Sequence, residues 1–199
     1  MEQTDTEWER TLTAFVGEKL LVTGELRAAL LRAKKHLDAG GADLLIFEDQ
    51  TGKQVDFDFR GTADEVIARA TMPAQKTGPG RPKLGVSSRE VSLLPRHWEW
   101  LETQPSGASA AIRRLIDEAR KREPEKERAR TARDAAGKVM WSLAGNLPDF
   151  EEASRALYSG DWDKVKDLIH KWPKDIRKYV QRLVDEAARL AASAAALPA

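Results

Sequence analysis

The chain has 199 residues, of which 41% are hydrophobic and 33% charged, with a formal net charge of +1. This composition is typical of folded globular proteins and excludes a low-complexity chain. The absence of cysteine excludes disulfides, thiolate metal sites and cysteine nucleophiles, and no apolar run is long enough to span a bilayer. The acidic N-terminal residues lack the layout of a signal peptide, so we expect a cytoplasmic protein.

The charges are unevenly distributed along the chain. Residues 1–75 hold 9 Lys and Arg against 14 Asp and Glu, whereas residues 76–133 hold 14 against 8. In residues 134–199 the two signs balance, with 10 of each. A basic excess in one segment indicates a polyanionic partner, although it does not indicate sequence specificity.

Residues 1–70 predict a small α+β domain. The pattern indicates a hairpin over 11–22, a helix over 26–37, strands over 43–48 and 53–60, and a short helix over 62–69 with Thr62 as its N-cap. The last strand is indicated by the strict alternation of Val55, Phe57 and Phe59 with polar residues. We expect a curved antiparallel sheet with one main helix across it.

Residues 71–88 read as a linker rich in proline, glycine and basic residues. The run Gly80-Arg81-Pro82-Lys83 resembles the core of an AT-hook, in which an extended segment lies in the narrow minor groove of A·T-rich DNA. The resemblance implies that Arg81 and Lys83 contact DNA. A basic, flexible linker without a ligand is the alternative interpretation.

Residues 89–122 predict one short strand followed by two helices. Val91 and Leu93 alternate with Glu90 and Ser92, which is the period of a half-buried strand. Proline at position 95 ends that strand and is tolerated in the first turn of a helix, and residues 105–107 separate this helix from a second one. So small a unit buries little apolar surface alone and usually needs a partner copy.

The second helix of this module carries the residues Gly107-x-Ser109-x-Ala111-Ile112-Arg113-x-Leu115-Ile116, with Ser109 as the expected N-cap. Together with the element order, these residues resemble a ribbon-helix-helix DNA-binding domain. In that family two chains pair their strands antiparallel, the ribbon enters the major groove, and N–H groups opening the second helix meet a phosphate.

The resemblance implies a homodimer that binds double-stranded DNA. The residues it assigns to DNA binding are Arg89, Glu90, Ser92, Arg96, Ser109 and Arg113, joined by the arm residues Arg81 and Lys83. The residues it assigns to the dimer interface are Val91, Leu93, Trp98, Leu101, Ile112, Leu115 and Ile116.

Each assigned role has a plainer alternative. The arginines would add salt-dependent phosphate contacts, but a solvated helix face is the commoner role of a single arginine. Glu90 and Ser92 would read base edges, or would form the wet side of a dimer ribbon. Trp98, Trp100 and Leu101 indicate a core or a dimer interface rather than a platform for base stacking.

Residues 125–199 predict an all-α domain. Helices are indicated over 125–144, 150–158 and 162–171, followed by a final helix that opens at Pro173. Asp149 and Asp161 are the expected N-caps of the middle two helices, and Gly160 is the expected stop between them.

No catalytic residue, cofactor or metal site is predicted. The three histidines are far apart in sequence and lack the spacing of metal ligands. Asp56 and Asp58, with Glu48 and Asp49 nearby, would suit a divalent metal, but a hydrated sheet face is the plainer interpretation. We therefore expect a protein that is not an enzyme, with a metal-dependent enzyme as a distant alternative.

Residues 80–86, 94–101 and 149–153 read GRPKLGV, LPRHWEWL and DFEEA. Through these residues the whole chain resembles an uncharacterised bacterial family, domain of unknown function 2239. The expected architecture is thus an α+β protein with an N-terminal α+β domain over 1–70, the linker, the ribbon-helix-helix-like module over 89–122, and a helical domain over 125–199.

The expected function is that of a homodimeric, nucleoid-located DNA-binding protein that regulates transcription or organises DNA. The alternative is a scaffold protein that uses the same module only to dimerise, with an unknown protein or ligand bound through the flanking domains.

Overall fold

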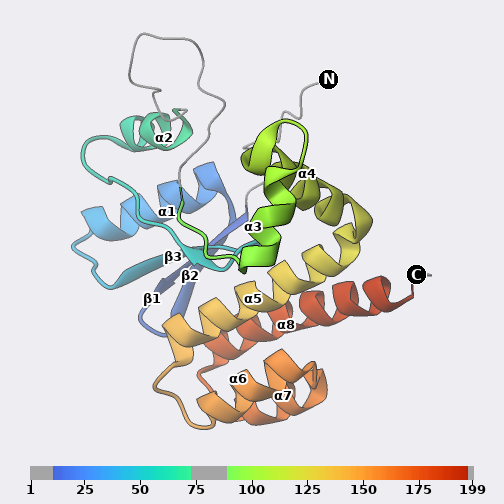
Figure 1. The fold of residues 1–199 in the computed structure, drawn as a ribbon. Helices are drawn as coiled ribbons and strands as arrows, with labels where there is room; N and C mark the ends of the chain where they lie inside the picture. The colour runs from blue at the N-terminus through green and yellow to red at the C-terminus, as the bar shows by residue number, and fades with distance from the viewer. Residues whose placement is uncertain (1–10, 73–88, 197–199) are drawn as a thin grey trace. The chain divides into compact units, whose positions relative to one another are not determined.

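Four short strands near the N-terminus form an antiparallel sheet in the order β2-β1-β3-β4 (Figure 1). The structure is a computed structural model that describes residues 11–72 and 89–196. The chain forms two compact units: unit 1 comprises Met1–Met72 and Glu125–Ala199, and unit 2 comprises Pro73–Pro124. The α+β fold class expected from the sequence is confirmed.

The sheet of unit 1 is built around β1 (Thr11–Val16), which pairs with β2 (Lys19–Glu25) through a turn at Gly17 and with β3 (Leu44–Glu48) on its other side. β4 (Lys53–Gln54) forms the edge beyond β3. The middle residues of β1 are buried without interruption. Since alternate side chains of a strand point to opposite faces, this sheet must be covered on both faces.

One face of the sheet is covered by α1 (Leu26–Asp38), whose Ala29 and Ala33 pack against Leu12 and Ile46. α2 (Ala63–Thr71) packs Val66 against α1 and is closed at its start by a capping box. In this box Thr62 Oγ1 accepts from the Glu65 N–H, and the Glu65 carboxylate accepts from the Thr62 N–H. The predicted N-cap of this helix is therefore confirmed.

The predicted strand over 53–60 is much shorter in the structure. Only Lys53–Gln54 is a strand, and one further hydrogen bond joins the Val55 N–H to the Ile46 carbonyl at 2.8 Å. The alternating residues Phe57 and Phe59 are half-buried, and their rings meet edge to face at 6.3 Å. They pack against α1 and α2 rather than along a sheet, so the periodicity reflects side-chain burial and not a continued ladder.

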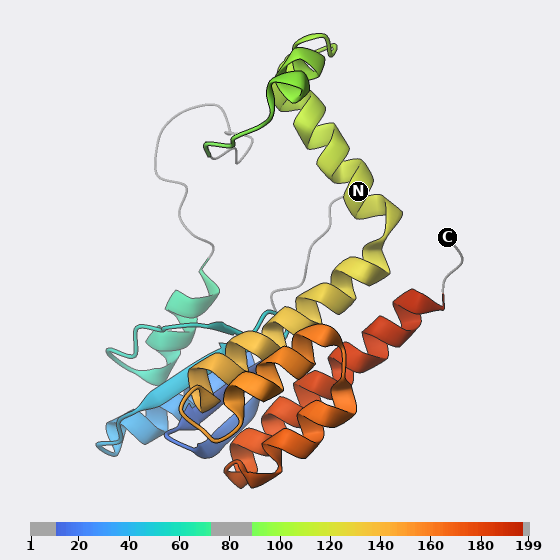
Figure 2. The same ribbon diagram turned by 60° about the horizontal axis from the view of Figure 1, so that its bottom comes forward.

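The other face of the sheet is covered by the C-terminal helices. These are α5 (Pro124–Ala144), α6 (Phe150–Ser159), α7 (Trp162–Leu168) with the 3-10 turn η2 (Ile169–Lys171), and α8 (Lys174–Ala195). α5 and α8 lie next to each other, and α6 and α7 lie beside them (Figures 1 and 2). Phe15 and Phe47 belong to the same buried cluster as Met140, Leu157 and Val180. The sequence divided these segments between two domains, whereas they share this core.

Most of the residues predicted to begin or end these helices do so in the structure. Gly160 ends α6 in the left-handed conformation, and the Asp161 side chain accepts from the Lys164 N–H at the start of α7. Asp149 occupies the N-cap position of α6 but makes no capping hydrogen bond, because its own backbone is left-handed (φ 60°). Pro124 opens α5 directly after α4, as proline at a helix start allows.

Unit 2 contains α3 (Pro95–Glu102) and α4 (Gly107–Arg122), joined by a short turn in which Ser106 and Gly107 both have positive φ. The predicted strand around Val91 and Leu93 is not formed, and residues 89–94 have no regular secondary structure. A ribbon strand needs a second strand for its hydrogen bonds, and a single chain does not supply one here. The expected N-cap is also wrong, since α4 begins two residues before Ser109.

The β3–β4 turn packs directly on α5 at one glycine. Gly52 has φ +63°, and a Cβ placed there would lie 2.2 Å from the carbonyl oxygen of Ala135. Gly40 has a similar φ of +82°, but a Cβ there would meet no atom within 4 Å. A side chain at Gly40 would therefore introduce backbone strain alone, whereas one at Gly52 would also clash with α5.

We expect Gly40→Ala to lower the free energy of unfolding by about 1–2 kcal/mol, through left-handed strain alone. Gly52→Ala should lower the free energy of unfolding by about 1–3 kcal/mol more than Gly40→Ala does, because the added methyl group forces the turn away from α5. Urea unfolding of the two variants measures the difference. Equal losses would contradict the close packing of the turn on α5.

Candidate functional site

The residues assigned to DNA binding in unit 2 are exposed where the structure describes them. Arg89, Arg96 and Arg113 are exposed, and among the described residues no carboxylate lies within ion-pair distance of their guanidinium groups. Arg114, one position further on α4, instead donates to Gln104 Oε1 at 3.3 Å and lies 3.8 Å from the Glu118 carboxylate. Neighbouring arginines on one helix thus differ in whether a protein partner neutralises them.

The polar residues assigned to base reading or phosphate binding are also exposed. Glu90 and Ser92 lie in the irregular segment before α3, and Ser109 lies within the first turn of α4. No side chain caps the start of α4 and no acidic residue occupies its first turn, so its free N–H groups face no built-in anion. Arg81 and Lys83 lie outside the described residues.

The residues assigned to the dimer interface are largely uncovered. Leu101 is buried at 4% exposure, and Leu93 and Ile112 are half-buried. The remaining residues of this set keep between 39% and 58% of their surface exposed, and they are Val91, Trp98, Leu115 and Ile116. Leu94 and Trp100 are exposed as well, at 49% and 47%, and were not assigned to the interface.

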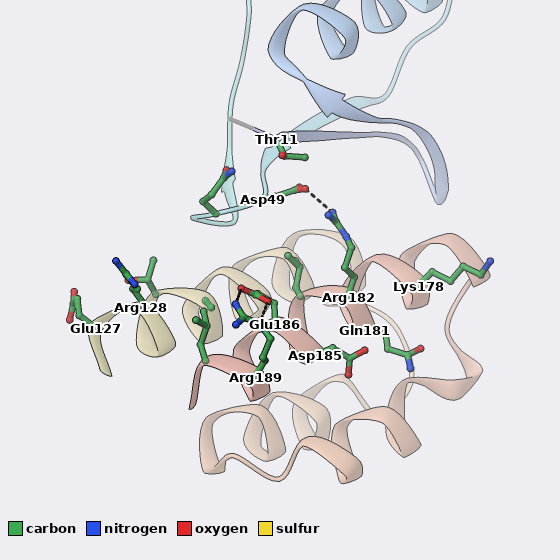
Figure 3. A pocket seen from close by; sticks show the side chains of 15 residues that line it. Thr11, Asp49, Glu127, Arg128, Lys178, Gln181, Arg182, Asp185, Glu186 and Arg189 are labelled. Atoms are coloured by element: carbon green, nitrogen blue, oxygen red, sulfur yellow. Dashed lines mark hydrogen bonds and ion pairs between the residues drawn. The ribbon is translucent and has the colours of Figure 1, made fainter. Parts of the chain in front are cut away.

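Unit 1 contains a separate cleft of about 1050 Å³, lined by the start of β1, the residues after β3, and facing parts of α5 and α8 (Figure 3). At its inner end Asp49 is almost fully buried. The Tyr179 hydroxyl donates to Asp49 Oδ1 at 2.8 Å, and Arg182 Nη2 donates to Oδ2 at 2.7 Å. Arg182 also donates to Thr13 Oγ1 at 3.3 Å and lies over the Tyr179 ring, 5.2 Å from its centroid.

The electrostatics of this group follow from its burial. Burial, followed by the charge of Asp49 and the hydrogen bond to it, raises the pKa of the Tyr179 phenol far above its ordinary value. The phenol therefore stays protonated and acts as a donor. A buried carboxylate that receives one charged and one neutral hydrogen bond is a stabilising tie between β3 and α8.

The other ionic groups of the cleft are mostly paired with one another. Asp185 lies 2.8 Å from Lys166, Glu186 lies 2.6 Å from Arg189, and Arg128 lies 3.0 Å from a carboxylate one turn earlier on α5. Figure 3 shows Arg182 pointing from α8 toward Asp49, and Arg189 beside Glu186. Pairs of this kind leave little unsatisfied charge for a ligand, so the cleft does not indicate a ligand class.

The sequence predicts the helix that carries Tyr179 but does not connect this residue to Asp49. The two residues are 130 positions apart, and no pattern in a single sequence links them. The sequence indicates Asp49 only as a neighbour of a possible metal site.

Among the acidic residues considered for a metal, Asp58 is engaged by two arginines. Arg60 donates two hydrogen bonds to the Asp58 carboxylate, at 2.9 and 2.8 Å, and these lower the pKa of Asp58 well below its usual range. Arg69 lies 3.6 Å from the same carboxylate. Within 11–72 and 89–196, no group of three or more His, Asp or Glu side chains is arranged to hold a metal ion.

No helix in the described segments has both the length and the apolarity needed to cross a bilayer.

The comparison with known proteins rests on the family model described as "Uncharacterized protein conserved in bacteria (DUF2239)", which matches residues 11–184. The chain belongs to this family. The match covers residues 11–72 and 125–184 of unit 1 and all of unit 2, so it includes the shared core and the helices α3 and α4. No curated protein and no solved structure matches the chain. The family description carries no activity, and function must come from the residues.

Replacing Tyr179 with phenylalanine tests the buried tie through its pH dependence. The folded-state pKa of Tyr179 is raised, so its contribution to stability is complete below about pH 10 and is lost as the pH rises further, when the unfolded chain ionises first. Tyr179→Phe should be less stable than the parent by about 1–3 kcal/mol at pH 7. The difference in the free energy of unfolding between the parent and Tyr179→Phe should narrow between about pH 10 and 12. Urea unfolding across this range measures it, and parallel stability curves would contradict the assignment.

Proposed function

We propose that this member of the DUF2239 family is a homodimeric DNA-binding protein, in which unit 2 makes the dimer and contacts the duplex. The observation that carries the proposal is the apolar surface of unit 2. Val91, Leu94, Trp98, Leu115 and Ile116 each keep 39% or more of their surface exposed in a unit of two short helices.

Such a surface is costly to leave in water. Each large apolar side chain gains about 1.5–3 kcal/mol when it is fully buried, and monomeric proteins rarely expose several of them together. Within the described part of unit 2, only Leu101 and Ala111 are apolar and fully buried. A second copy of the same unit offers an identical apolar surface, and two-fold pairing would bury both at once.

The segment before α3 supports the same partner. Residues 89–94 lack a strand ladder, although Val91 and Leu93 alternate with polar residues and Leu94 has an extended backbone (φ −66°, ψ 150°). Its backbone groups would find partners in the same segment of a second copy, as in a two-stranded antiparallel ribbon. One dimer would thus bury the apolar side chains and give the backbone N–H and C=O groups of this segment hydrogen-bond partners.

The charge of unit 2 supports DNA as the ligand. Arg89, Arg96 and Arg113 are exposed without a described carboxylate partner, and the start of α4 has no capping side chain. Free guanidinium groups and free helix N-terminal N–H groups are the usual donors to backbone phosphates. Glu90 opposes this trend, because a carboxylate on the ribbon needs a base donor such as the cytosine amino group, or a neighbouring arginine.

Dimerisation is tested by a charge placed on the apolar surface. Ile116→Glu should convert the protein from dimer to monomer at micromolar concentration, because a carboxylate at the centre of a dry interface loses its hydration. Leu20→Glu is the matched control, since Leu20 is an exposed apolar residue of unit 1 at 43% exposure. Multi-angle light scattering measures the molar mass of both variants. A parent protein that is already a monomer would refute the dimer.

DNA binding is tested by comparing adjacent arginines on α4. Arg113→Gln should weaken duplex binding and reduce the slope of log affinity against log salt by about one unit for each phosphate that the variant no longer binds. Arg114→Gln should have a smaller effect, since Gln104 and Glu118 already engage Arg114. Fluorescence anisotropy on random and A·T-rich duplexes at several salt concentrations measures both. A stable dimer that binds neither duplex would support the scaffold alternative instead.

A further inference from the structure

Unit 1 has a second surface with exposed aromatic and basic side chains. It is a groove of about 570 Å³ between the β3–β4 turn, the middle of α5, and α6. Two aromatic residues of this groove are unusually exposed, Trp141 at 73% and Tyr158 at 50%. Aromatic side chains gain more from burial than most others, so their exposure in one groove suggests a ligand with its own flat, apolar surface.

The protein contacts both rings in part, and the Arg133 guanidinium lies over the Tyr158 ring, 5.6 Å from its centroid. Trp141 meets Phe150 edge to face, with ring centroids 5.8 Å apart. Tyr158 lies against α5 at Gly137, where an added Cβ would come within 2.5 Å of the phenol oxygen. Phe150 and Gly137 thus set the orientation of the two rings, while much of their surface remains open.

Two lysines border the same groove. Lys138 Nζ donates to the Thr51 carbonyl at 3.1 Å, which holds this ammonium group at the rim beside the turn. Lys53 lies on β4, at the edge of the sheet. Within the described chain, no carboxylate lies within ion-pair distance of either lysine, whereas Arg130 on α5 is paired with Glu127 at 2.7 Å.

One acidic residue also lines the groove, and it is engaged within the turn. The Thr51 hydroxyl donates to the Glu48 carboxylate at 2.5 Å. The groove therefore combines two lysines that have no described acidic partner with two exposed aromatic rings.

We propose that this groove binds an unpaired nucleotide of a single-stranded nucleic acid. A base would stack on Trp141 or Tyr158, and the backbone phosphate would lie beside Lys53 and Lys138. A planar base explains the exposed rings, and a phosphate explains the unneutralised ammonium groups. A proline-rich peptide would account for the aromatic rings but not for the lysines, and a free anion would account for the lysines but not for the rings. The inference does not depend on duplex binding by unit 2.

The test compares two single strands of equal length and charge on the full chain. One is a fluorescent twelve-residue oligothymidylate, and the other is an abasic strand with the same phosphates. The parent protein should prefer the strand that carries bases. Trp141→Ala should weaken oligothymidylate binding by about 5- to 100-fold and abolish the preference, because base stacking is lost.

Matched variants separate stacking from charge. Leu31→Ala removes an exposed apolar side chain of unit 1 outside the groove, at 40% exposure, and should leave both affinities unchanged. Lys53→Ala combined with Lys138→Ala should weaken binding of both strands and reduce the salt slope by about 0.7 for each phosphate that is no longer bound. Lys35→Ala, a change on α1 outside the groove, should leave that slope unchanged.

Clear outcomes would overturn the proposal. Equal affinity for the two strands would exclude base stacking, and so would parental binding by Trp141→Ala. Because Trp141 is mostly exposed, its removal should leave the melting temperature close to that of the parent, and Trp141→Phe should restore part of the preference. Absence of duplex binding with an intact preference for bases would count against duplex binding by unit 2 alone, and not against this groove.

Discussion

Burial of the two central strands on both faces is the constraint on which unit 1 depends. Leu12 and Ile46 meet α1 on one face, while Phe15 and Phe47 point to the other and meet the ring of Tyr179, with centroids 5.4 and 6.4 Å away. Because strand side chains alternate, the same few residues hold an N-terminal helix on one side and the C-terminal helices on the other. The C-terminal helices supply most of the main buried cluster, and Phe15 and Phe47 join the N-terminal segment to it. The chain can therefore leave unit 1 after Met72 and return at Glu125, since packing fixes both ends.

Asp49 fixes the position of α8 against the end of β3 in this otherwise apolar contact. Hydrophobic packing tolerates sliding of one element over another, whereas a buried carboxylate is stable only where its donors are. Tyr179 and Arg182 are one helical turn apart on α8 and reach the two oxygens of the same carboxylate, at 2.8 and 2.7 Å. This arrangement permits one register of α8 against the end of β3. The cleft beside it is therefore best understood as the outer side of a structural tie, since most of its other charges are also paired.

Local signals in the sequence predicted much of this fold, and long-range pairing accounts for what they missed. The capping residues Thr62 and Asp161 and the stop at Gly160 act through neighbours a few positions away, so their sequence context was sufficient. The run from Leu44 to Phe47 is apolar at every position, which is typical of a strand buried on both faces, but nothing local identifies the C-terminal helices as the second cover. β4 ends early because Phe57 and Phe59 pack against α1 and α2 instead of continuing the ladder along β3. The segment 89–94 alternates as a strand does, but no strand of the described residues pairs with it.

The two proposed nucleic-acid surfaces rest on a shared physical argument. A single exposed arginine or lysine is ordinary on a protein surface, and so is a single exposed leucine. What requires an explanation is their coincidence: in unit 2 Arg113 lies one turn from exposed Ile116 on α4, and in unit 1 Lys138 lies one turn from exposed Trp141. Water solvates a cation well and an apolar side chain poorly, so a surface that presents both fits a partner that offers charge and apolar area together. A second copy of unit 2 would cover aliphatic side chains and leave its arginines for phosphates. The groove of unit 1 offers flat rings instead, and a ring is matched by a base that has left its duplex. The difference between Ile116 and Trp141 is therefore the difference between a surface suited to a protein copy and one suited to an unpaired strand.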